Sequence, residues 1–387
     1  MAEPDVRQRN AAALLWSLRQ DGPATRAELA GRTGLAKATV GAIVGNLEQA
    51  GAVSAHEQVR SGDRGRPGLR LTLAGGRHVG IGFEANVEYV AAVVVDLSGA
   101  VRHRVTRPVA DVRWVERALA ALAEEVAALL CAEGLHPVGA TVAVPGLIAE
   151  DDRTIAWTPN LDLTGTSLAE LVDGAFGWQD CVRVSNDADC AALAELHHGA
   201  GRGTDHLLYL TGTVGIGAGL VDGGRLVRGA RGFAGEVGHL PIGLPGARCG
   251  CGRLGCWEAT IGLHAVLARV GLPELDTPEA TARAVADVAR RDPAVHAALV
   301  EIGVDLGRGL AILTGVLDPA VIVLGGYFGP LADVMLIPAR TVLGSTLAEP
   351  LQGLPHLRSG ELGTESAALG AAERSLAEVY DGTIEVV

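Results

Sequence analysis

Residues 235–259 read GEVGHLPIGLPGARCGCGRLGCWEA and contain three of the six cysteines of the chain, Cys249, Cys251 and Cys256. His239 precedes them in the same stretch. Three thiolates and one imidazole are the ligand set typical of a closed tetrahedral zinc site. The glycines between the cysteines allow the backbone to turn tightly around an ion. The alternative is a group of buried free thiols, but the close spacing favours a structural zinc ion with no coordination position left for water.

The charge of the chain is distributed unevenly. Its 387 residues are enough for two or three domains, and the net charge is −13. Residues 1–76 carry 10 Lys and Arg against 7 Asp and Glu, or +3, whereas residues 77–387 carry 22 against 38, or −16. A small basic segment on a large acidic body indicates that the first segment contacts a polyanion.

The sequence shows no sign of secretion or of a membrane span. The start, MAEPDVRQRN, has no apolar leader, and no run of about 20 apolar residues is free of charges or of Gly and Pro. We therefore expect a cytoplasmic protein with no membrane partner. Thiols stay reduced in the cytoplasm, which favours a metal ion over disulfides for the cysteine cluster.

The basic segment shows the pattern of three short helices, over residues 6–22, 25–34 and 35–51, each ending at a glycine. Thr25 and Glu28 have the spacing of a capping box at the start of the second helix. Two short helices joined by a tight turn are the layout of a helix-turn-helix, whose second helix enters the major groove of DNA.

A hairpin follows the three helices. The run AVSAHEQVRSGDRGRPGLRLTL at 52–73 has two strand-like ends around a loop rich in Gly and Arg, which predicts the wing of a winged helix. The residues expected to contact DNA are Lys37, Ala38 and Thr39 in the third helix and Arg60, Arg64 and Arg66 in the wing. A small helical domain that binds protein is the alternative, but the order of the elements favours DNA.

The acidic body alternates between strands and helices. Residues 79–105 read as three strands joined by turns, and a helix over 113–133 and a buried strand over 139–146 follow. A second, glycine-rich hairpin begins at 205–229. Two similar halves of this kind predict an α/β body with two lobes and a cleft between them.

A family resemblance follows from these motifs. The run E-V-G-H at 236–239 with C-G-C-G-R-L-G-C-W-E at 249–258 resembles the signature of the ROK family of repressors, open reading frames and sugar kinases. The resemblance extends over residues 79–380, and a winged helix in front is the arrangement of its repressor branch. It implies an actin-like ATPase fold, similar to sugar kinases, with a sugar in the cleft and zinc on His239 and the three cysteines.

The resemblance also implies the domain boundaries. We expect a winged helix-turn-helix domain (α+β) over 1–76, a first lobe over 77–195 that is joined by a C-terminal helix over 363–380, and a second lobe with the zinc site over 196–362. Two winged helices on successive major grooves of a pseudo-palindromic operator require at least two chains, so we expect a homodimer or homotetramer.

The candidate sugar site includes Asn186 and Asp187 in VSNDADCAALAE at 184–195, just after a short strand. Carboxylates and amides suit sugar hydroxyls, which both donate and accept hydrogen bonds. By themselves these two residues could equally cap a helix. The resemblance implies that Asp187 stands at the position of the catalytic base of the kinases and Asn186 at that of its sugar-binding neighbour. The other sugar-binding residues that it implies are Glu236, His239 and Glu258, with weaker matches at Gly146 and Asn160.

The first phosphate loop departs from the kinase pattern. ROK kinases carry a D-x-G-G-T-type loop in the first strand turn, where this chain has EANVE at 84–88, from Glu84 to Glu88. No glycine remains there, and the carboxylate of Glu88 would repel a triphosphate. The glycine-rich run TGTVGIGAG at 211–219 and the pair Gly325–Gly326 are only weak signs of a nucleotide site. We therefore expect neither ATP nor Mg²⁺ as a cofactor.

These features together predict a sugar-responsive transcriptional repressor, not an enzyme, which binds operator DNA and a sugar effector. Because Asp187 is retained, one alternative is an active ATP-dependent sugar kinase, similar to glucokinase, with an appended DNA-binding domain. Another is a constitutive DNA-binding protein with a vestigial sugar pocket. The identity of the sugar, and whether it releases or promotes DNA binding, do not follow from the sequence.

Overall fold

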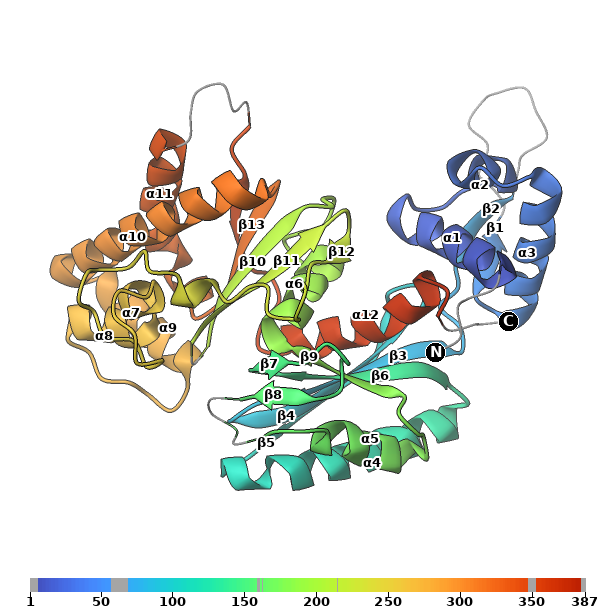
Figure 1. Cartoon of the computed structure of the whole chain (residues 1–387), viewed down its shortest axis with the longest axis horizontal. Helices are drawn as coiled ribbons and strands as arrows, with labels where there is room; N and C mark the ends of the chain where they lie inside the picture. Colours follow the sequence, from blue (N-terminus) through green and yellow to red (C-terminus); the bar gives the residue numbers. More distant parts are fainter. Residues whose placement is uncertain are drawn as a thin grey trace. The chain divides into compact units, whose positions relative to one another are not determined.

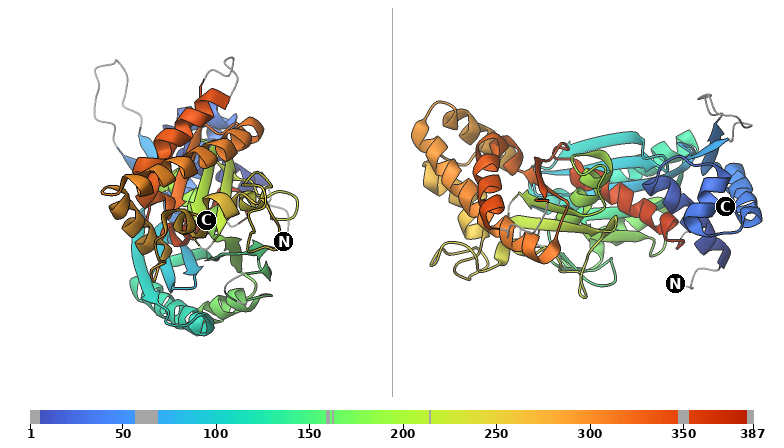
Figure 2. Two further views of the ribbon diagram at one scale, coloured as in Figure 1. Left: turned by 90° about the vertical axis from the view of Figure 1, so that its left-hand side faces the viewer. Right: turned by 90° about the horizontal axis from the view of Figure 1, so that it is seen from above.

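The computed structural model of the chain is shown in Figure 1 and Figure 2. It describes residues 6–56, 69–158, 161, 163–213, 215–346 and 353–383. Across these ranges, no helix combines the length and the apolar character needed to cross a membrane.

The chain forms two compact units. The first unit contains residues 1–146, 152–185 and 371–387, and the second contains residues 147–151 and 186–370. In this grouping the winged helix falls in the first unit, and residues 186–198 fall in the second. The domain boundaries expected from the sequence, 1–76, 77–195 with 363–380, and 196–362, stay a prediction.

The N-terminal part of the first unit is a winged helix. It consists of α1 (Val6–Gln20), α2 (Arg26–Thr33), α3 (Lys37–Ala50), β1 (Val53–His56) and β2 (Arg70–Leu73), and the two strands pair in antiparallel fashion. The predicted capping box is present, since Thr25 Oγ1 accepts a hydrogen bond from the Glu28 amide and Glu28 Oε2 accepts one from the Thr25 amide. The loop between the strands, with Arg60, Arg64 and Arg66, lies outside the described residues.

The rest of the first unit is built on a five-stranded sheet with the order β5-β4-β3-β6-β9. Its strands are β3 (His78–Ala85), β4 (Tyr89–Asp96), β5 (Val101–Pro108), β6 (His136–Val144) and β9 (Val182–Asn186). The pairs β3–β4 and β4–β5 are antiparallel, whereas β3 and β6 are parallel. Figure 1 shows α4 (Val115–Glu133) and α5 (Ser167–Phe176) on one face of the sheet and α12 (Ser366–Tyr380) on the other. Shorter elements are η1 (Val112–Trp114), β7 (Leu147–Ile148) and β8 (Ile155–Trp157).

The second unit repeats the same strand order in its own sheet, β12-β11-β10-β13-β14. Its strands are β10 (Leu207–Gly212), β11 (Ile216–Asp222), β12 (Arg225–Leu226), β13 (Val321–Gly326) and β14 (His356–Ser359). In both sheets the first three strands form an antiparallel meander and the fourth pairs in parallel with the first. The two similar halves predicted from the sequence are thereby confirmed.

Helices complete the second unit. They are α6 (Asp187–His198), η2 (Val237–His239), α7 (Glu258–Ile261), α8 (Leu263–Val270), α9 (Pro278–Ala289), α10 (Pro293–Leu317) and α11 (Phe328–Thr346). Figure 2 shows α10 and α11 side by side, and both contribute to the main hydrophobic core of this unit.

The packing of α6 on β11 depends on glycine. A Cβ atom on Gly219 would lie 2.5 Å from the carbonyl oxygen of Ala188, and one on Gly217 would lie 3.3 Å from the Ala188 methyl group. The helix therefore rests directly on the backbone of the strand. This contact explains why α6 groups with the second unit.

Replacement of Gly219 by alanine should separate α6 from β11. We expect Gly219→Ala to lower the free energy of unfolding by about 1–3 kcal/mol, because the new methyl group overpacks a tight contact. The matched control is Gly174→Ala in α5, where no atom lies within 4 Å of the new Cβ. It should raise the stability by up to about 1 kcal/mol through helix propensity. Urea denaturation measures both, and equal effects of the two variants would contradict the packing argument.

Candidate metal centre and carboxylate site

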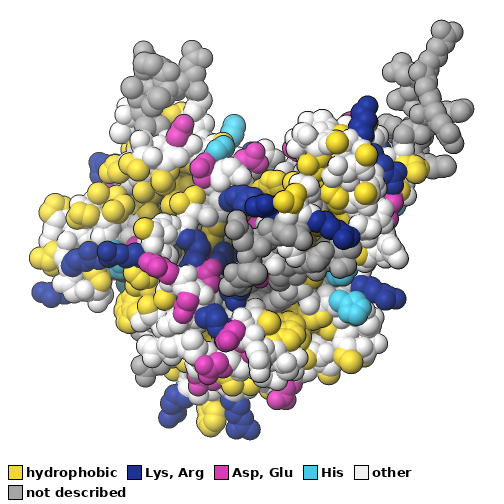
Figure 3. Space-filling view, turned by 45° about the vertical axis from the view of Figure 1, so that its right-hand side comes forward, with side chains coloured by type: hydrophobic (Ala, Val, Ile, Leu, Met, Phe, Trp, Pro, Cys, Tyr) yellow, Lys and Arg dark blue, Asp and Glu magenta, His cyan; other side chains and the backbone are white. Residues whose placement is uncertain are grey.

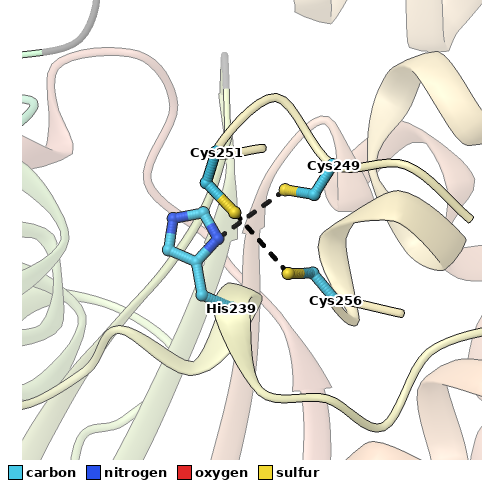
Figure 4. Close-up of side chains that lie close together, drawn as sticks. All are labelled: His239, Cys249, Cys251 and Cys256. Carbon is cyan, nitrogen blue, oxygen red and sulfur yellow. Dashed lines mark hydrogen bonds between the residues drawn. The ribbon is translucent and has the colours of Figure 1, made fainter. Parts of the chain in front are cut away.

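Four potential metal ligands converge in the second unit. The ligand atoms of His239, Cys249, Cys251 and Cys256 all lie within 4.8 Å of one another, and Figure 4 shows the four side chains around a common centre. Cys249 Sγ is 3.8 Å from His239 Nδ1, and Cys251 Sγ is 3.7 Å from Cys256 Sγ. A tetrahedron with Zn–S bonds of about 2.3 Å has edges of about 3.8 Å, so this donor set and its spacing fit a tetrahedral metal ion.

The loop that carries the cysteines is shaped by its own backbone. The Cys249 amide donates to the Arg253 carbonyl at 2.9 Å, and the Gly252 amide donates to the Cys249 carbonyl at 3.0 Å. Gly252 has a φ of +87°, a conformation that residues with a side chain rarely adopt. This tight turn brings Cys249 and Cys251 to the same side of the loop.

The end of the loop is anchored in the hydrophobic core. The Trp257 side chain is only 1% exposed, packs against Gly309 of α10, and donates from Nε1 to the Asp305 carbonyl at 3.3 Å. Cys256 and Glu258 flank this tryptophan in the sequence. The core contact therefore fixes one metal ligand and one candidate sugar ligand at the same time, a role of Trp257 that the motif alone did not reveal.

The thiols differ in their readiness to ionise. Hydrogen bonds from the backbone and side chain of Arg253 lower the pKa of Cys251, whereas burial raises the pKa of Cys249 and of Cys256. The exposed Cys251 is therefore the thiol that loses its proton most easily. A metal ion bound here must displace protons from the two buried thiols, so its affinity will increase with pH.

His239 and Glu236 extend the cluster toward the candidate sugar residues. Because Nδ1 of His239 faces Cys249, the opposite ring nitrogen faces Glu236, with 4.0 Å between Nε2 and Oε2. A metal ion on Nδ1 would keep the proton on Nε2. His239 could therefore serve as a metal ligand and at the same time offer an N–H donor beside a carboxylate.

Glu258 ties the metal loop to strand β11. Its Oε2 accepts a hydrogen bond from the Ile216 amide at 2.9 Å, and its Oε1 contacts Cys249 Sγ at 3.2 Å. A Cβ on Gly215 would lie 2.8 Å from Oε2, so a side chain at this position would displace the carboxylate. No sequence motif indicates this bond, because it joins residues 42 positions apart.

Glycines also place the EVGH segment on β11. A Cβ on Gly238 would lie 2.5 Å from the Ile216 carbonyl oxygen, and one on Gly235, where φ is +98°, would clash with the Ala218 carbonyl. The segment therefore lies directly against the strand. As a result, Glu236 and His239 are held beside the strand on which α6 also packs.

Asn186 and Asp187 lie where β9 ends and α6 begins. Asn186 is the N-cap, and its Oδ1 accepts hydrogen bonds from the Ala188 and Asp189 amides at 2.8 and 3.2 Å. The capping alternative is thus confirmed for that oxygen, and a sugar contact by Asn186 has to come from Nδ2. Burial raises the pKa of Asp187 to about 6, and the nearby charge of Glu236 adds to the shift.

The carboxylates of Asp187, Glu236 and Glu258 influence one another electrostatically. Burial and the charge of Glu258 raise the pKa of Glu236, whereas His239 opposes the shift. Gly146 lies at the end of β6 in the first unit, where a Cβ would be 2.5 Å from the Trp157 carbonyl oxygen. Asn160 lies outside the described residues.

Side chains of the turn at 84–88 form hydrogen bonds within the turn and with Tyr89. Glu84 is only 3% exposed, and its Oε1 accepts hydrogen bonds from the Tyr89 hydroxyl at 2.7 Å and from Asn86 Nδ2 at 3.4 Å. The Glu88 amide in turn donates to Asn86 Oδ1 at 3.4 Å. Glu84 Oε1, the Asn86 side chain and the Glu88 amide are therefore engaged in hydrogen bonds within this segment, and the contribution of Tyr89 follows from no sequence motif.

Comparison with known proteins distinguishes the winged helix from the body that follows it. The ROK family model matches residues 80–377, and a model of winged helix-turn-helix DNA-binding domains matches residues 9–54. A xylose repressor from Bacillus spizizenii is 27% identical over 94% of both chains. A glucokinase from Streptomyces coelicolor is 28% identical over 76% of this chain and 96% of its own. The crystal structure of a ROK family transcriptional regulator has a TM-score of 0.80 at 24% identity over 97% of both chains, which confirms the fold.

Cobalt should report on the metal site directly. We expect one equivalent of Co²⁺ per chain to give the visible bands of a tetrahedral ion with sulfur ligands, because the donor set and spacing match. Cys256→Ser should weaken this binding by more than about tenfold. Cys181→Ser, which removes an exposed thiol outside the cluster, is the control and should bind like the wild type. Octahedral spectra, or equal loss in both variants, would contradict the assignment.

The environment of Asp187 should make stability depend on pH. Its folded pKa of about 6 lies above the ordinary value of 3.8, so its contribution to stability is present at low pH and is lost as the pH rises through about 6. The gain in Tm from Asp187→Asn should therefore grow between about pH 4.5 and pH 7.5. Glu150→Gln, at an exposed position, controls for the change in charge. A gain that is constant over this range would show that Asp187 is not destabilised by ionisation.

Proposed function

The chain belongs to the ROK family, and we propose that it is a sugar-responsive transcriptional repressor. The observation that carries this proposal is a winged helix in front of a ROK body whose carboxylate and histidine cluster is intact, while its first strand turn is closed. The similarity to a xylose repressor over nearly the whole chain supports it. Because a transcriptional regulator works where the DNA is, we propose that the protein is cytoplasmic.

The proposed sugar site combines acceptors and donors in the second unit. Asp187, Glu236 and Glu258 supply carboxylates, and His239 supplies the Nε2–H donor, while Asn186 can contribute its Nδ2. We retain Gly146 and Asn160 as further sugar-binding residues. A cluster of partly buried carboxylates is costly unless hydroxyl groups donate to it, so a polyhydroxy ligand suits this site.

We propose that the metal ion is zinc and that its role is structural. Four protein ligands complete a tetrahedron and leave no position for a reacting water. When bound, zinc would hold His239 and the cysteine loop in place, and Glu258 would stay in contact with the same loop. The ion thereby fixes the geometry of the sugar-binding side chains.

The proposed DNA-reading residues lie at the start of α3. Lys37 and Ala38 are exposed and Thr39 is half-buried, while Val40, Ile43, Val44 and Leu47 are buried on the opposite side of the helix. Small side chains allow the helix end to approach base edges, and Lys37 can contact a phosphate. In Figure 3, basic side chains lie on the surface of this domain, at the upper right. We propose that Arg60, Arg64 and Arg66 assist from the wing and that a homodimer or homotetramer presents two such domains to the operator.

A sugar kinase is the second candidate. It is favoured by the pKa of Asp187, which at about 6 suits a general base near neutral pH, and by the similarity to a glucokinase. A kinase also needs a cradle of backbone N–H groups for phosphates and a Mg²⁺ site. In this chain Asn86 and Tyr89 donate hydrogen bonds to Glu84 in the acidic turn. In the second loop the Ile216 amide donates to Glu258. These residues do not fit ATP and Mg²⁺, so we propose that the chain binds neither.

Operator binding with a panel of sugars separates the two functions. We expect the full chain to bind DNA from its own promoter region and one sugar of the panel to change that affinity by about 5–150-fold, the usual range of allosteric coupling. Lys37→Ala should weaken binding and reduce its salt dependence. Fluorescence anisotropy measures these quantities. Absence of operator binding at low salt would reject the repressor, and sugar-dependent ADP release that Asp187→Asn abolishes would favour the kinase.

A further inference from the structure

Helix α12 connects the proposed sugar-binding unit with the winged helix along one unbroken element. Its first residues, 366–370, belong to the second unit, and the remainder, up to Tyr380, belongs to the first. A helix transmits displacement of one end to the other because its backbone hydrogen bonds make it stiff. The elements that α12 contacts at its two ends are therefore the ones whose movements it can couple.

The first end of α12 packs on α6. Gly370 lies so close to the Cys190 carbonyl that a Cβ atom would collide with it. Ala367, Ala368 and Leu369 are buried beside this contact. Because α6 begins at Asp187, the same helix carries a proposed sugar ligand at its N-terminus and the contact with α12 in its first turns. Movement of α6 on ligand binding would therefore reach α12 directly.

The second part of α12 is fixed on the sheet of the first unit. Ser375 Oγ donates to the Ile81 carbonyl at 2.8 Å and contacts Thr141 Oγ1 at 3.0 Å. A Cβ on Gly80 would lie 2.5 Å from the Ala372 carbonyl oxygen, so the helix rests on the backbone of β3. The Tyr380 hydroxyl closes the end of the helix by donating to the Leu97 carbonyl at 3.2 Å.

The same part of α12 holds α1 of the winged helix. Arg19 and Glu373 form an ion pair with 2.6 Å between Nη2 and Oε2, and their side chains are only 10% and 2% exposed. The rings of Trp16 and Tyr380 add a second contact, with centroids 6.4 Å apart. Figure 1 shows α1 beside the C-terminal end of α12. Contacts between residues far apart in the sequence thus hold the winged helix on α12.

The contact between α1 and α12 is sensitive to the loss of either partner of the buried ion pair. Burial alone would lower the pKa of Arg19, but the charge and hydrogen bond of Glu373, together with Tyr380 and Asp96, outweigh it, so the pKa of Arg19 is raised. Removing one partner would leave the other as a buried charge without its counter-ion. Leu14, Leu15 and Leu18 on α1 are buried. Since α1 is held in this way, any change of the docking contact reorients α3 as well.

We propose that the Arg19–Glu373 pair is a positioning contact that fixes the winged helix on α12, so that the orientation of the DNA-reading helix follows the helix that also packs on α6. This inference rests on the proposed function, because it assigns the route by which a sugar at the start of α6 changes operator affinity. Arg19 and Glu373 themselves contact neither sugar nor DNA in this scheme. They affect the factor by which sugar binding changes the operator affinity.

Hydrogen exchange on the full chain tests the docking contact without any ligand. In Glu373→Gln and in Arg19→Met, amide exchange in α1 and in residues 371–380 should increase by at least about tenfold, while α6 and the zinc loop keep their protection. The matched control is Glu125→Gln, which breaks an exposed ion pair with Arg107 of 3.1 Å. Unchanged exchange in α1 of both variants would overturn the proposal.

Operator titrations with and without the active sugar test the coupling. The factor by which the sugar changes operator affinity should fall at least threefold in Glu373→Gln, although the thermal shift caused by the sugar stays that of the wild type. The double variant Arg19→Glu with Glu373→Arg should recover most of that factor. Unchanged coupling in the single variants would overturn the route. If no sugar changes the operator affinity of the wild type, the proposed function fails instead. Hydrogen exchange then still decides whether the pair holds the winged helix on α12.

Discussion

The candidate site depends on one constraint, the approach of two chain segments to the backbone of β11. Gly219 and Gly217 admit α6 on that strand, and Gly238 admits the segment that carries Glu236 and His239. Glycine costs conformational entropy on folding, so its use at these positions has a structural purpose. Any side chain there would move Asp187 relative to Glu236, and a binding site tolerates only displacements of a few tenths of an ångström. The strand therefore positions the proposed ligand-binding groups Asp187, Glu236 and His239.

The metal cluster and the carboxylates share residues, and this sharing has a thermodynamic consequence. His239 faces Cys249 with one ring nitrogen and Glu236 with the other, while Glu258 contacts Cys249 and the Ile216 amide. Two ligands that contact a common group affect each other's affinity by the same factor. If the cluster holds a metal ion and the carboxylates hold a sugar, as proposed, the affinities of the two ligands are linked even though the metal takes no part in chemistry.

Local features were predictable from the sequence, and long-range ones were not. The capping box of Thr25 and Glu28 and the cysteine cluster lie within short segments, so spacing alone identifies them. The contact that groups α6 with the second unit could not be predicted, because it involves Gly219, 31 positions beyond Ala188. The Arg19–Glu373 pair joins residues 354 positions apart and leaves no local pattern. Nor did the resemblance indicate that Tyr89 closes the acidic turn, because a tyrosine after a turn is commonplace.

The retained Asp187 does not by itself distinguish a kinase from a regulator. A carboxylate with a raised pKa can take a proton from a sugar hydroxyl in catalysis, and it can equally accept a hydrogen bond from the same hydroxyl without any reaction. What separates the two functions is where the phosphates would go. A regulator needs only a different affinity of its two states for the sugar, whereas a kinase must also stabilise charge that develops on a phosphoryl group. We propose that the phosphates of a kinase would lie at the turn of Glu84 and Glu88, where the carboxylates would repel them, and for this reason we favour the function that requires no phosphate.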